Sequence, residues 1–439
     1  MTLQQLFRHH LRERLAYLEQ ALARTGFGAL VISSGTPFVY YLDDHEAPFQ
    51  GVPHFRHYCP LEGAHHLLRL QPGSKPLLVR YVPADYWDEQ LPMTDAGWWA
   101  DEFELTEAPT VDAVWDRIGR PARGACLGDV PDRARAAGLE PNPPALSNLL
   151  DWGRSYKSPY EIRCLEEATA LGVKGHLAAR EAFLAGATEV EIHHAFVTAA
   201  GCVDHELAFP SIVALDPKGA TLHYRNKRRV GHGRVLLVDC GVRVRGYGSD
   251  ITRTSTAPAC DPRFRDLARA LQAVQLKLAG LLKPGLPFPQ VHHHAHAELA
   301  ALLHHAGILK GDLEASLAEG LTRPFMPHGL GHFLGITIHD VAGRFTGPDG
   351  AILPPPGHYP ALRTTRVLEP RQVVTVEPGL YFIPMLLEPF RQGPQRNRFD
   401  WKLIDELTPF GGIRFEDNVV ITGDGARNVT RECLPEWEV

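Results

Sequence analysis

Residues 326–335 read MPHGLGHFLG and place two histidines, His328 and His332, four positions apart, with His339 a little further along the chain. On a helix this spacing would put both histidines on one face, as in a helical metal-binding pair. Glycines occupy two of the three positions between them, however, and glycine disfavours a continuous helical turn. We therefore predict an extended or bent backbone that sends the two side chains to different parts of one pocket.

Four other segments have the pattern of buried strands and yet contain acidic residues. They are VLLVDCGV, GSDITRTS, VVTVEPGLYF and IRFEDNVVIT, and the acids of interest are Asp239, Asp250, Glu377 and Glu416. Aliphatic and β-branched residues are frequent in these runs, as they are in strands. A bare carboxylate in a buried strand is costly, so it is usually paired, protonated or bound to a metal.

A shared cation explains these acids better than four separate ion pairs do, although any one of them alone would be an ordinary ion-paired residue. Four carboxylates and the imidazole of His332 can ligate two divalent ions if some carboxylates bridge. The glycine-containing connection between Asp239 and Asp250 predicts a hairpin or bent strand pair that brings both carboxylates together. Oxygen-rich ligation with one nitrogen favours Mn²⁺, with Co²⁺, Zn²⁺ or Fe²⁺ as alternatives.

Length and composition indicate two globular domains. A chain of 439 residues is too long for one ordinary domain, and its 44% hydrophobic and 22% charged residues are typical of soluble proteins. A proline-rich stretch at residues 139–150 precedes SPYE, residues 158–161, which has the pattern of a helix cap followed by an N1 proline and a capping-box glutamate. We predict a small α/β domain over residues 1–155 and a second domain over residues 156–439.

Charge, cysteines and hydropathy exclude several classes of protein. The net charge of −6 provides no basic footprint for nucleic acid. The seven cysteines are scattered and form no CxxC pair, which predicts a reducing cytoplasm instead of a disulfide framework. No apolar run approaches the roughly 18 residues of a membrane span, and the charged N-terminus predicts an amphipathic helix and no targeting segment.

The motifs and their order resemble a known family. Asp239 and Asp250 are followed by HGLGHFLGITIHD (328–340), VEPG (376–379) and RFEDN (414–418). This order is similar to that of the pita-bread metallopeptidases, and most closely to their bacterial Xaa-Pro dipeptidase (prolidase) branch. The resemblance runs through nearly the whole chain and implies a small N-terminal α/β domain followed by a C-terminal pita-bread catalytic domain of α+β form, like that of creatinase and aminopeptidases.

The resemblance also implies a dinuclear metal site and a reaction. The expected ligands of two divalent ions per subunit are Asp239, Asp250, His332, Glu377 and Glu416. Mn²⁺ is the expected ion, with Co²⁺ or Zn²⁺ as alternatives. The family reaction is hydrolysis of an Xaa-Pro dipeptide to a free amino acid and proline. In that scheme a metal-bridging hydroxide attacks the carbonyl carbon and Glu377 shuttles the proton.

Further site residues are implied near the substrate. His328 and His339 match positions that donate hydrogen bonds to the tetrahedral oxyanion or to the substrate. His223 and Arg363 match positions that hold the substrate's C-terminal carboxylate. Arg414 lies two residues before Glu416, so we expect it to orient that carboxylate or to line the substrate pocket.

Family members are usually homodimers in which the N-terminal domain closes the neighbour's site, so Asp43, Asp44 or Trp87 is expected near the site of the partner. Phe209 stands where the prolidase branch usually carries a tyrosine, which predicts altered substrate preference without loss of a metal ligand.

Alternative functions use the same ligands. One is an aminopeptidase that removes the residue before proline from longer peptides, and another is a catalytically silent pita-bread binding protein. A side activity on organophosphate esters is also implied, because a metal hydroxide can attack phosphorus as well as carbon.

The segment VHHHAHAE, residues 291–298, has a more obvious histidine pattern than any motif above. His292 and His296 are spaced i, i+4 on an expected helix, but no acidic partner from another element is indicated. We interpret these histidines as a solvated helix face.

Overall fold

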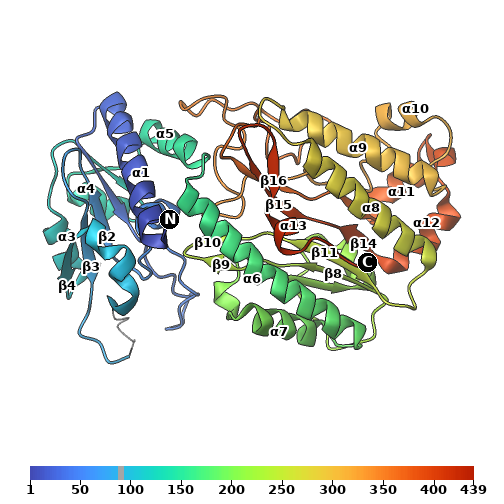
Figure 1. Ribbon diagram of the computed structural model, residues 1–439, viewed down its shortest axis with the longest axis horizontal. Helices are drawn as coiled ribbons and strands as arrows, with labels where there is room; N and C mark the ends of the chain where they lie inside the picture. Colours follow the sequence, from blue (N-terminus) through green and yellow to red (C-terminus); the bar gives the residue numbers. More distant parts are fainter. Residues whose placement is uncertain (88–92) are drawn as a thin grey trace. The chain divides into compact units, whose positions relative to one another are not determined.

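The computed structural model describes residues 1–87 and 93–439 and divides into two compact units (Figure 1). The N-terminal unit consists of residues 1–154, 158–161 and 347–351, and the C-terminal unit consists of residues 155–157, 162–346 and 352–439.

The N-terminal unit is an α/β structure built on one six-stranded sheet with strand order β4-β3-β2-β1-β5-β6. Strand β1 pairs in parallel with β5, whereas β2 is antiparallel to both of its neighbours. The elements are α1 (Leu3–Thr25), β1 (Ala29–Ser33), α2 (Pro53–Tyr58), β2 (Leu67–Leu70), β3 (Leu77–Tyr81), β4 (Glu104–Ala108), α3 (Val111–Ile118), β5 (Gly124–Leu127), α4 (Pro131–Ala136), β6 (Glu140–Pro141) and α5 (Pro144–Arg154).

Local sequence explains the first helix of this unit. Thr2 and Gln5 form a reciprocal capping box at the start of α1, and Gly26 ends the helix with a left-handed φ of 79°. Phe7, Leu11 and Leu18 are among the residues that α1 buries. The predicted amphipathic helix at the N-terminus is therefore confirmed.

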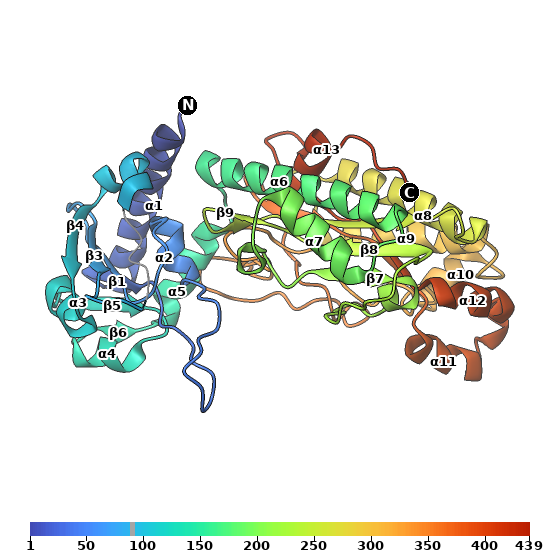
Figure 2. The ribbon, with the colours of Figure 1, turned by 90° about the horizontal axis from the view of Figure 1, so that it is seen from below.

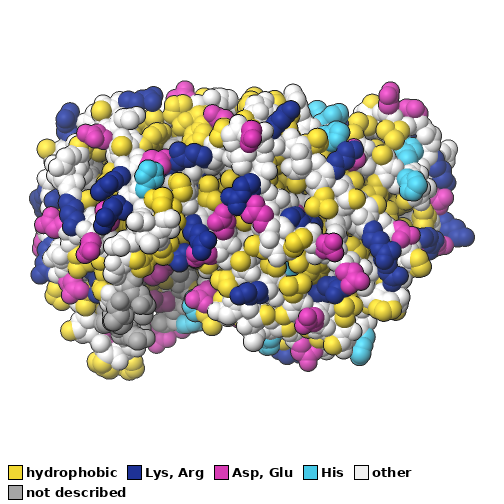
Figure 3. Space-filling model, in the orientation of Figure 1, with side chains coloured by type: hydrophobic (Ala, Val, Ile, Leu, Met, Phe, Trp, Pro, Cys, Tyr) yellow, Lys and Arg dark blue, Asp and Glu magenta, His cyan; other side chains and the backbone are white. Residues whose placement is uncertain are grey.

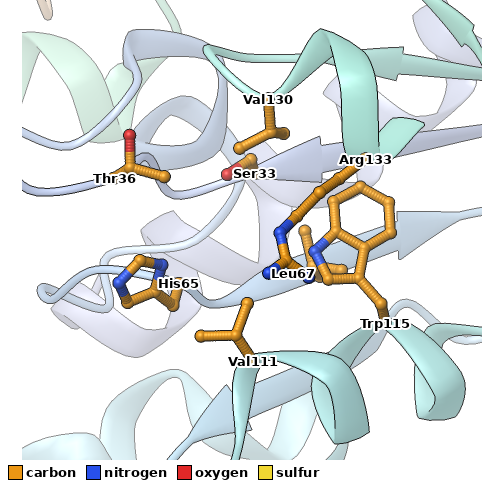
Figure 4. Close-up of a pocket in the computed structure, with 8 residues that line it drawn as sticks. All are labelled: Ser33, Thr36, His65, Leu67, Val111, Trp115, Val130 and Arg133. Atoms are coloured by element: carbon orange, nitrogen blue, oxygen red, sulfur yellow. The ribbon is translucent and has the colours of Figure 1, made fainter. Parts of the chain in front are cut away.

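A shallow hollow lies at the carboxyl end of β1 (Figure 4). Leu67, Val111 and Trp115 form much of its apolar wall, and Arg133 reaches into it while its Nη1 donates to Asp112 over 2.7 Å. None of the predicted site residues lines this hollow.

The C-terminal unit contains two three-stranded antiparallel sheets, β11-β8-β7 and β12-β15-β16. Its elements are α6 (Pro159–Leu184, whose first turn belongs to the N-terminal unit), α7 (Glu189–Ala200), β7 (Ile212–Leu215), β8 (Val235–Asp239), β9 (Arg243–Val244), β10 (Tyr247–Gly248), β11 (Thr252–Thr256), α8 (Pro262–Leu281), α9 (Phe288–His305), α10 (Leu313–Ala318), β12 (Val373–Val376), β13 (Gly379–Tyr381), α11 (Pro384–Gln392), α12 (Trp401–Leu407), β14 (Gly412–Arg414), β15 (Asp417–Ile421), β16 (Ala426–Asn428) and α13 (Val429–Cys433).

Each sheet of the C-terminal unit is covered by a pair of long helices (Figure 1). Helices α6 and α7 pack Phe183 and Phe196 against β7 and β8, and helices α8 and α9 pack Leu271 and Leu299 within the core that includes β12 and β15. An isolated backbone bridge joins Thr252 of β11 to Glu416, which lies between β14 and β15. The metal-site candidates lie at this junction.

The surface carries both signs of charge. On the face shown in Figure 3, basic and acidic side chains are interspersed. Within the described residues, no helix is both long enough and apolar enough to cross a membrane.

Candidate metal centre

The four candidate acids lie where strands end or break, and not in the middle of strands. Asp239 is the last residue of β8, and Asp250 lies between β10 and β11. Glu377 separates β12 from β13, and Glu416 separates β14 from β15. The continuous strands expected around Glu377 and Glu416 are therefore interrupted. At each of these two acids the backbone leaves its strand, and the carboxylate lies near the bridge between Thr252 and Glu416.

Strand pairing brings the acids together. The predicted hairpin between Asp239 and Asp250 is confirmed as the antiparallel pair β9 and β10, and the register of β8 with β11 places Asp239 opposite Thr252. In the other sheet, β12 pairs with β15 so that Val376 faces Asp417, each next to a candidate acid. The bridge between Thr252 and Glu416 then unites the two halves of the site.

Ligand atoms of Asp250, His332 and Glu416 all lie within 4.8 Å of one another. His332 Nε2 is 3.4 Å from Asp250 Oδ2 and 3.6 Å from Glu377 Oε1. Asp239 is tied to the same group through electrostatic interaction with Asp250. All five predicted ligands therefore share one largely buried site.

His332, the candidate histidine ligand, has one nitrogen whose role is fixed by the backbone. His332 Nδ1 is 2.9 Å from the carbonyl oxygen of Phe333, and a carbonyl only accepts, so Nδ1 carries the proton and donates. Nε2 faces the carboxylates of Asp250 and Glu377, which raise the pKa of His332 although burial opposes this shift. A metal-ligating histidine typically has this arrangement, in which its other nitrogen is held by a neighbouring carbonyl.

Electrostatics in the site favour a bound cation. Burial raises the pKa of Asp239 to about 6 and that of Glu377 to about 7, even though Arg414 opposes both shifts. Burial, reinforced by the charge of Asp250, raises the pKa of Glu416 well above its ordinary value. Asp239 Oδ1 is buried and has no hydrogen-bond partner among the described residues. Divalent ions would neutralise these carboxylates, so the residues fit a metal site.

The backbone of MPHGLGHFLG is not helical, as predicted. Leu334 N–H donates to Val373 O over 2.9 Å and Thr375 N–H donates to His332 O over 2.9 Å, so this segment lies alongside β12 like an added strand. His332 points to the carboxylates, whereas His328 Nε2 contacts the hydroxyl of Tyr381 at 2.9 Å. The two histidines therefore reach different parts of the site.

Tyr381 is a site residue that the sequence analysis missed. Its fully buried hydroxyl accepts a hydrogen bond from Arg414 Nη1 over 2.8 Å and lies between that guanidinium and His328. His328 Nδ1 is 2.8 Å from the carbonyl oxygen of Gly329, so Nδ1 donates and Nε2 accepts from Tyr381. A tyrosine in a buried strand needs a partner for its hydroxyl, which is the signal that could have indicated it.

Arg414 is buried and contacts several site residues. Its Nη2 donates to Asp239 Oδ2 over 2.6 Å, and its Nε donates to Thr252 Oγ1 over 3.0 Å. The hydroxyl of Thr252 is in turn 2.7 Å from Glu416 Oε2. Arg414 thus reaches Glu416 through Thr252, and its direct carboxylate contact is with Asp239.

His223, His339 and Arg363 each keep part of their surface accessible to solvent, although the rings of His223 and His339 are partly shielded by the surrounding residues. The ring of His339 lies edge-on to His332 at a centroid separation of 4.5 Å. Burial, His332 and Arg363 together lower the pKa of His339 to about 3. Burial and nearby arginines, including Arg414 and Arg363, also lower the pKa of His223. The three predicted substrate residues therefore lie within one another's electrostatic reach.

The residues expected to act across a dimer belong to the N-terminal unit. Asp43, Asp44 and Trp87 are exposed, and the Trp87 ring packs against that of Tyr86 at 4.9 Å. Phe209 is half-buried.

The expectation of a solvated face on VHHHAHAE is wrong for two of its histidines. His292 and His296 are each only 1% exposed. Burial lowers the pKa of His292 to about 2 and that of His296 to about 3, so both rings are neutral. The face of α9 that packs against the core could not be identified from histidine spacing alone.

Comparisons with known proteins agree with this geometry. Residues 163–423 match the model of metallopeptidase family M24, and residues 5–152 match that of the Xaa-Pro dipeptidase N-terminal domain. A Marinobacter nauticus protein named Xaa-Pro dipeptidase is 43% identical over 97% of both chains. A Cronobacter sakazakii protein of the same name is 40% identical over 98% of this chain and 99% of its own.

Solved structures show the same fold. A Pseudomonas aeruginosa aminopeptidase aligns with a TM-score of 0.76 and 22% identity over 97% of this chain and 96% of its own. Zinc-substituted aminopeptidase P from E. coli, in complex with product, aligns with a TM-score of 0.73 and 24% identity over 99% and 96%. The chain therefore belongs to metallopeptidase family M24, with a small N-terminal α/β domain followed by a C-terminal pita-bread catalytic domain.

Proposed function

We propose that this protein hydrolyses Xaa-Pro dipeptides to a free amino acid and proline at a dinuclear metal site. The buried group of four carboxylates and one imidazole carries the proposal, since divalent cations would neutralise carboxylates whose ionisation burial disfavours. The choice of substrate is supported by relatives named Xaa-Pro dipeptidase that align over nearly their whole length.

The proposed ligands are Asp239, Asp250, His332, Glu377 and Glu416. Their oxygen-rich composition favours Mn²⁺, with Co²⁺ or Zn²⁺ as alternatives. Held by these residues, two divalent ions would lower the pKa of a bound water and would polarise the scissile carbonyl.

The chain's own residues then have separate tasks. Glu377 is proposed to shuttle the proton, and in the metal-free protein burial raises the pKa of this carboxyl to about 7. The Oε2 of Glu377 is 3.7 Å from His328 Nδ1. His339 is proposed to donate a hydrogen bond to the oxyanion or to the substrate. The same role expected of His328 is not available in this arrangement, because its Nδ1 donates to Gly329 O and its Nε2 accepts from the Tyr381 hydroxyl.

Arg363 and His223 are proposed to hold the substrate's C-terminal carboxylate. Both are exposed, and the guanidinium of Arg363 suits a carboxylate because it can donate two parallel hydrogen bonds. For Arg414, the contacts with Asp239, Thr252 and Tyr381 support an orienting role more than direct substrate binding.

The deciding experiment measures hydrolysis of Gly-Pro by metal-stripped protein after Mn²⁺, Co²⁺ or Zn²⁺ is added back. We expect metal-dependent release of proline, which Glu377→Gln lowers by at least about a hundredfold. Cleavage of Gly-Pro-Ala at a comparable rate would favour the aminopeptidase instead. Metal binding without cleavage of either peptide would indicate a silent binding protein.

We extend the proposal to a side activity on organophosphate esters, because the same hydroxide can attack phosphorus. Release of p-nitrophenol from diethyl p-nitrophenyl phosphate, lost in parallel with Gly-Pro hydrolysis in Glu377→Gln, tests this extension.

We further propose that residues 1–155 form dimer contacts and close the partner's site. The segment that joins β1 to α2 extends away from the sheet (Figure 2) and exposes Tyr41 and Leu42, which are 91% and 89% accessible. Trp87, at 80%, is similarly exposed. Such apolar side chains are typical of interaction sites.

A complementation assay tests this dimer. A double variant, Asp43→Ala with Asp44→Ala, is mixed and refolded with Glu377→Gln. If these residues act in trans, mixed dimers regain activity at one of their two sites. No recovery, or a monomeric mass by sedimentation, contradicts the proposal.

We also propose a cytoplasmic location. All seven cysteines are free thiols, and a reducing compartment keeps thiols in this state.

A further inference from the structure

The buried histidines of α9 are not part of the proposed metal site, and yet one of them contacts the segment that carries the site histidines. His292 Nδ1 lies 3.2 Å from the backbone nitrogen of Leu330. Since a backbone nitrogen can only donate, the neutral His292 ring accepts this hydrogen bond. Leu330 lies between His328 and His332 in the sequence, so α9 holds the middle of MPHGLGHFLG.

Leu330 also contacts the metal site from its other side. Its carbonyl oxygen accepts a hydrogen bond from the backbone N–H of Glu377 over 2.8 Å. One peptide segment therefore connects the His292 ring to the backbone of the proposed proton shuttle. Leu330 is fully buried, so its N–H has no access to water and would be costly to leave unpaired.

The ring of His292 is itself held by aromatic contacts. It lies edge-on to Tyr359 at 4.4 Å and edge-on to His296 at 4.8 Å, and Tyr359 stacks on His296 at 4.7 Å with an angle of 12°. His296 Nδ1 is hydrogen-bonded to Thr322 Oγ1 at 2.9 Å. These contacts fix the direction of the His292 lone pair.

The same cluster reaches a substrate residue. The carbonyl of Tyr359 accepts from Leu362 N–H over 3.1 Å, and Arg363 is the next residue. The cluster of His292, His296 and Tyr359 is therefore hydrogen-bonded to two segments of the site. One segment carries His328 and His332, and the other carries Arg363.

We propose that His292 is a positioning residue, which sets the register of residues 328–332 against β12 through Leu330 and thereby places His332 Nε2 and Glu377 for metal binding. The proposal rests on the proposed function for its effect on catalysis, but its effect on metal binding can be measured without a substrate.

Three substitutions of His292 separate hydrogen bonding from packing. His292→Leu keeps an apolar side chain and removes the acceptor. His292→Asn places an amide oxygen close to the position of Nδ1, whereas His292→Gln carries its oxygen further out, near the position of Nε2. His305→Leu is the matched control, because His305 is also on α9 but is exposed.

The primary measurement is Mn²⁺ affinity of metal-stripped protein, determined by calorimetric titration, with hydrogen exchange of residues 328–334 as a second readout. We expect His292→Leu and His292→Gln to weaken Mn²⁺ binding by about 10- to 100-fold and to speed exchange in this segment. His292→Asn should recover most of the affinity, and His305→Leu should match the parent protein. For Gly-Pro, kcat should fall with the affinity, while KM at saturating Mn²⁺ should change by less than about threefold.

The outcomes separate the two proposals. Unchanged Mn²⁺ affinity in a folded His292→Leu protein would overturn the positioning role. If His292→Leu does not fold, the pair of polar variants decides, and equal Mn²⁺ affinity in His292→Asn and His292→Gln would also overturn it. If the parent protein binds Mn²⁺ but does not cleave Gly-Pro, the proposed function fails while the positioning role is still tested by affinity and exchange.

Discussion

At the scale of single residues, the hydroxyl of Thr252 connects two charged groups of the site. It accepts from Arg414 Nε over 3.0 Å and lies 2.7 Å from Glu416 Oε2, to which it donates. A threonine placed in this way decides which face of the carboxylate is available to a metal. Thr375, in the sheet that contains β12, has a comparable position, because its hydroxyl oxygen accepts a hydrogen bond from the backbone N–H of His332 over 3.1 Å.

We predict that Thr252→Val, which has the same shape without the hydroxyl, weakens Mn²⁺ binding and lowers kcat by about tenfold or more. The reason is that Glu416 and Arg414 each lose a hydrogen bond in a buried site. Thr252→Ser keeps the hydroxyl and should stay within about threefold of the parent protein. Equal loss in both variants, measured by calorimetry and Gly-Pro kinetics, would contradict the role of the hydroxyl, because Thr252→Ser keeps it.

Residue patterns indicated the proposed metal ligands because a carboxylate in an apolar run is anomalous by itself. Tyr381 and Thr252 were not found, since a tyrosine or a threonine in a strand is ordinary, and only the three-dimensional partners reveal their roles. His292 was misassigned for a related reason. Histidine tolerates both solvent and core, so its spacing on α9 did not show which face would be buried.

At the scale of elements, the glycines of MPHGLGHFLG allow a close backbone approach. A Cβ on Gly331 would lie 2.0 Å from the carbonyl oxygen of Thr375 in β12, a separation that side chains do not adopt. The sequence correctly indicated that this segment is not helical, but its docking beside β12 depends on a contact with residues more than forty positions away and could not be predicted locally.

We predict that Gly331→Ala forces the segment away from β12, because the clash is with backbone and not with a flexible side chain. The loss of Mn²⁺ binding should be nearly complete, and the thermal midpoint should fall by several degrees. The control is Gly280→Ala on the exposed surface of α8, where a Cβ meets no atom within 4 Å. This variant should be neutral or stabilise by up to about 1 kcal/mol. Normal Mn²⁺ affinity in Gly331→Ala would contradict the proposed docking.

At the scale of the whole molecule, the fold unites two sheets so that each contributes two acids to one site. Asp239 and Asp250 come from one half, and Glu377 and Glu416 come from the other. In the absence of metal this arrangement brings four carboxyl groups together in a largely buried site. Stability, metal binding and pH must therefore be linked.

The titration of Glu377 makes the metal-free protein less stable as the pH rises. Burial raises its pKa from the ordinary value of 4.5 to about 7 in the folded metal-free protein, so the folded state binds a proton more tightly than the unfolded state does. The stabilisation by this proton is fully present below pH 4.5 and is lost as the pH rises through about 7. Asp239, with a pKa raised to about 6, adds a loss of the same sign.

We predict that metal-free protein loses about 2–3 kcal/mol of stability relative to metal-free Glu377→Gln between pH 5 and pH 8, since glutamine carries no titrating proton. Denaturant unfolding of both proteins across this pH range measures the difference between their free energies of unfolding. The titration of histidines elsewhere affects both proteins equally and cancels in this difference. Saturating Mn²⁺ should reverse the trend for the parent protein, because deprotonated ligands bind the ion better and binding at a hundred times Kd adds about 2.7 kcal/mol. A constant difference between the two metal-free proteins would mean that Glu377 does not titrate between pH 5 and pH 8, and that burial does not raise its pKa to about 7.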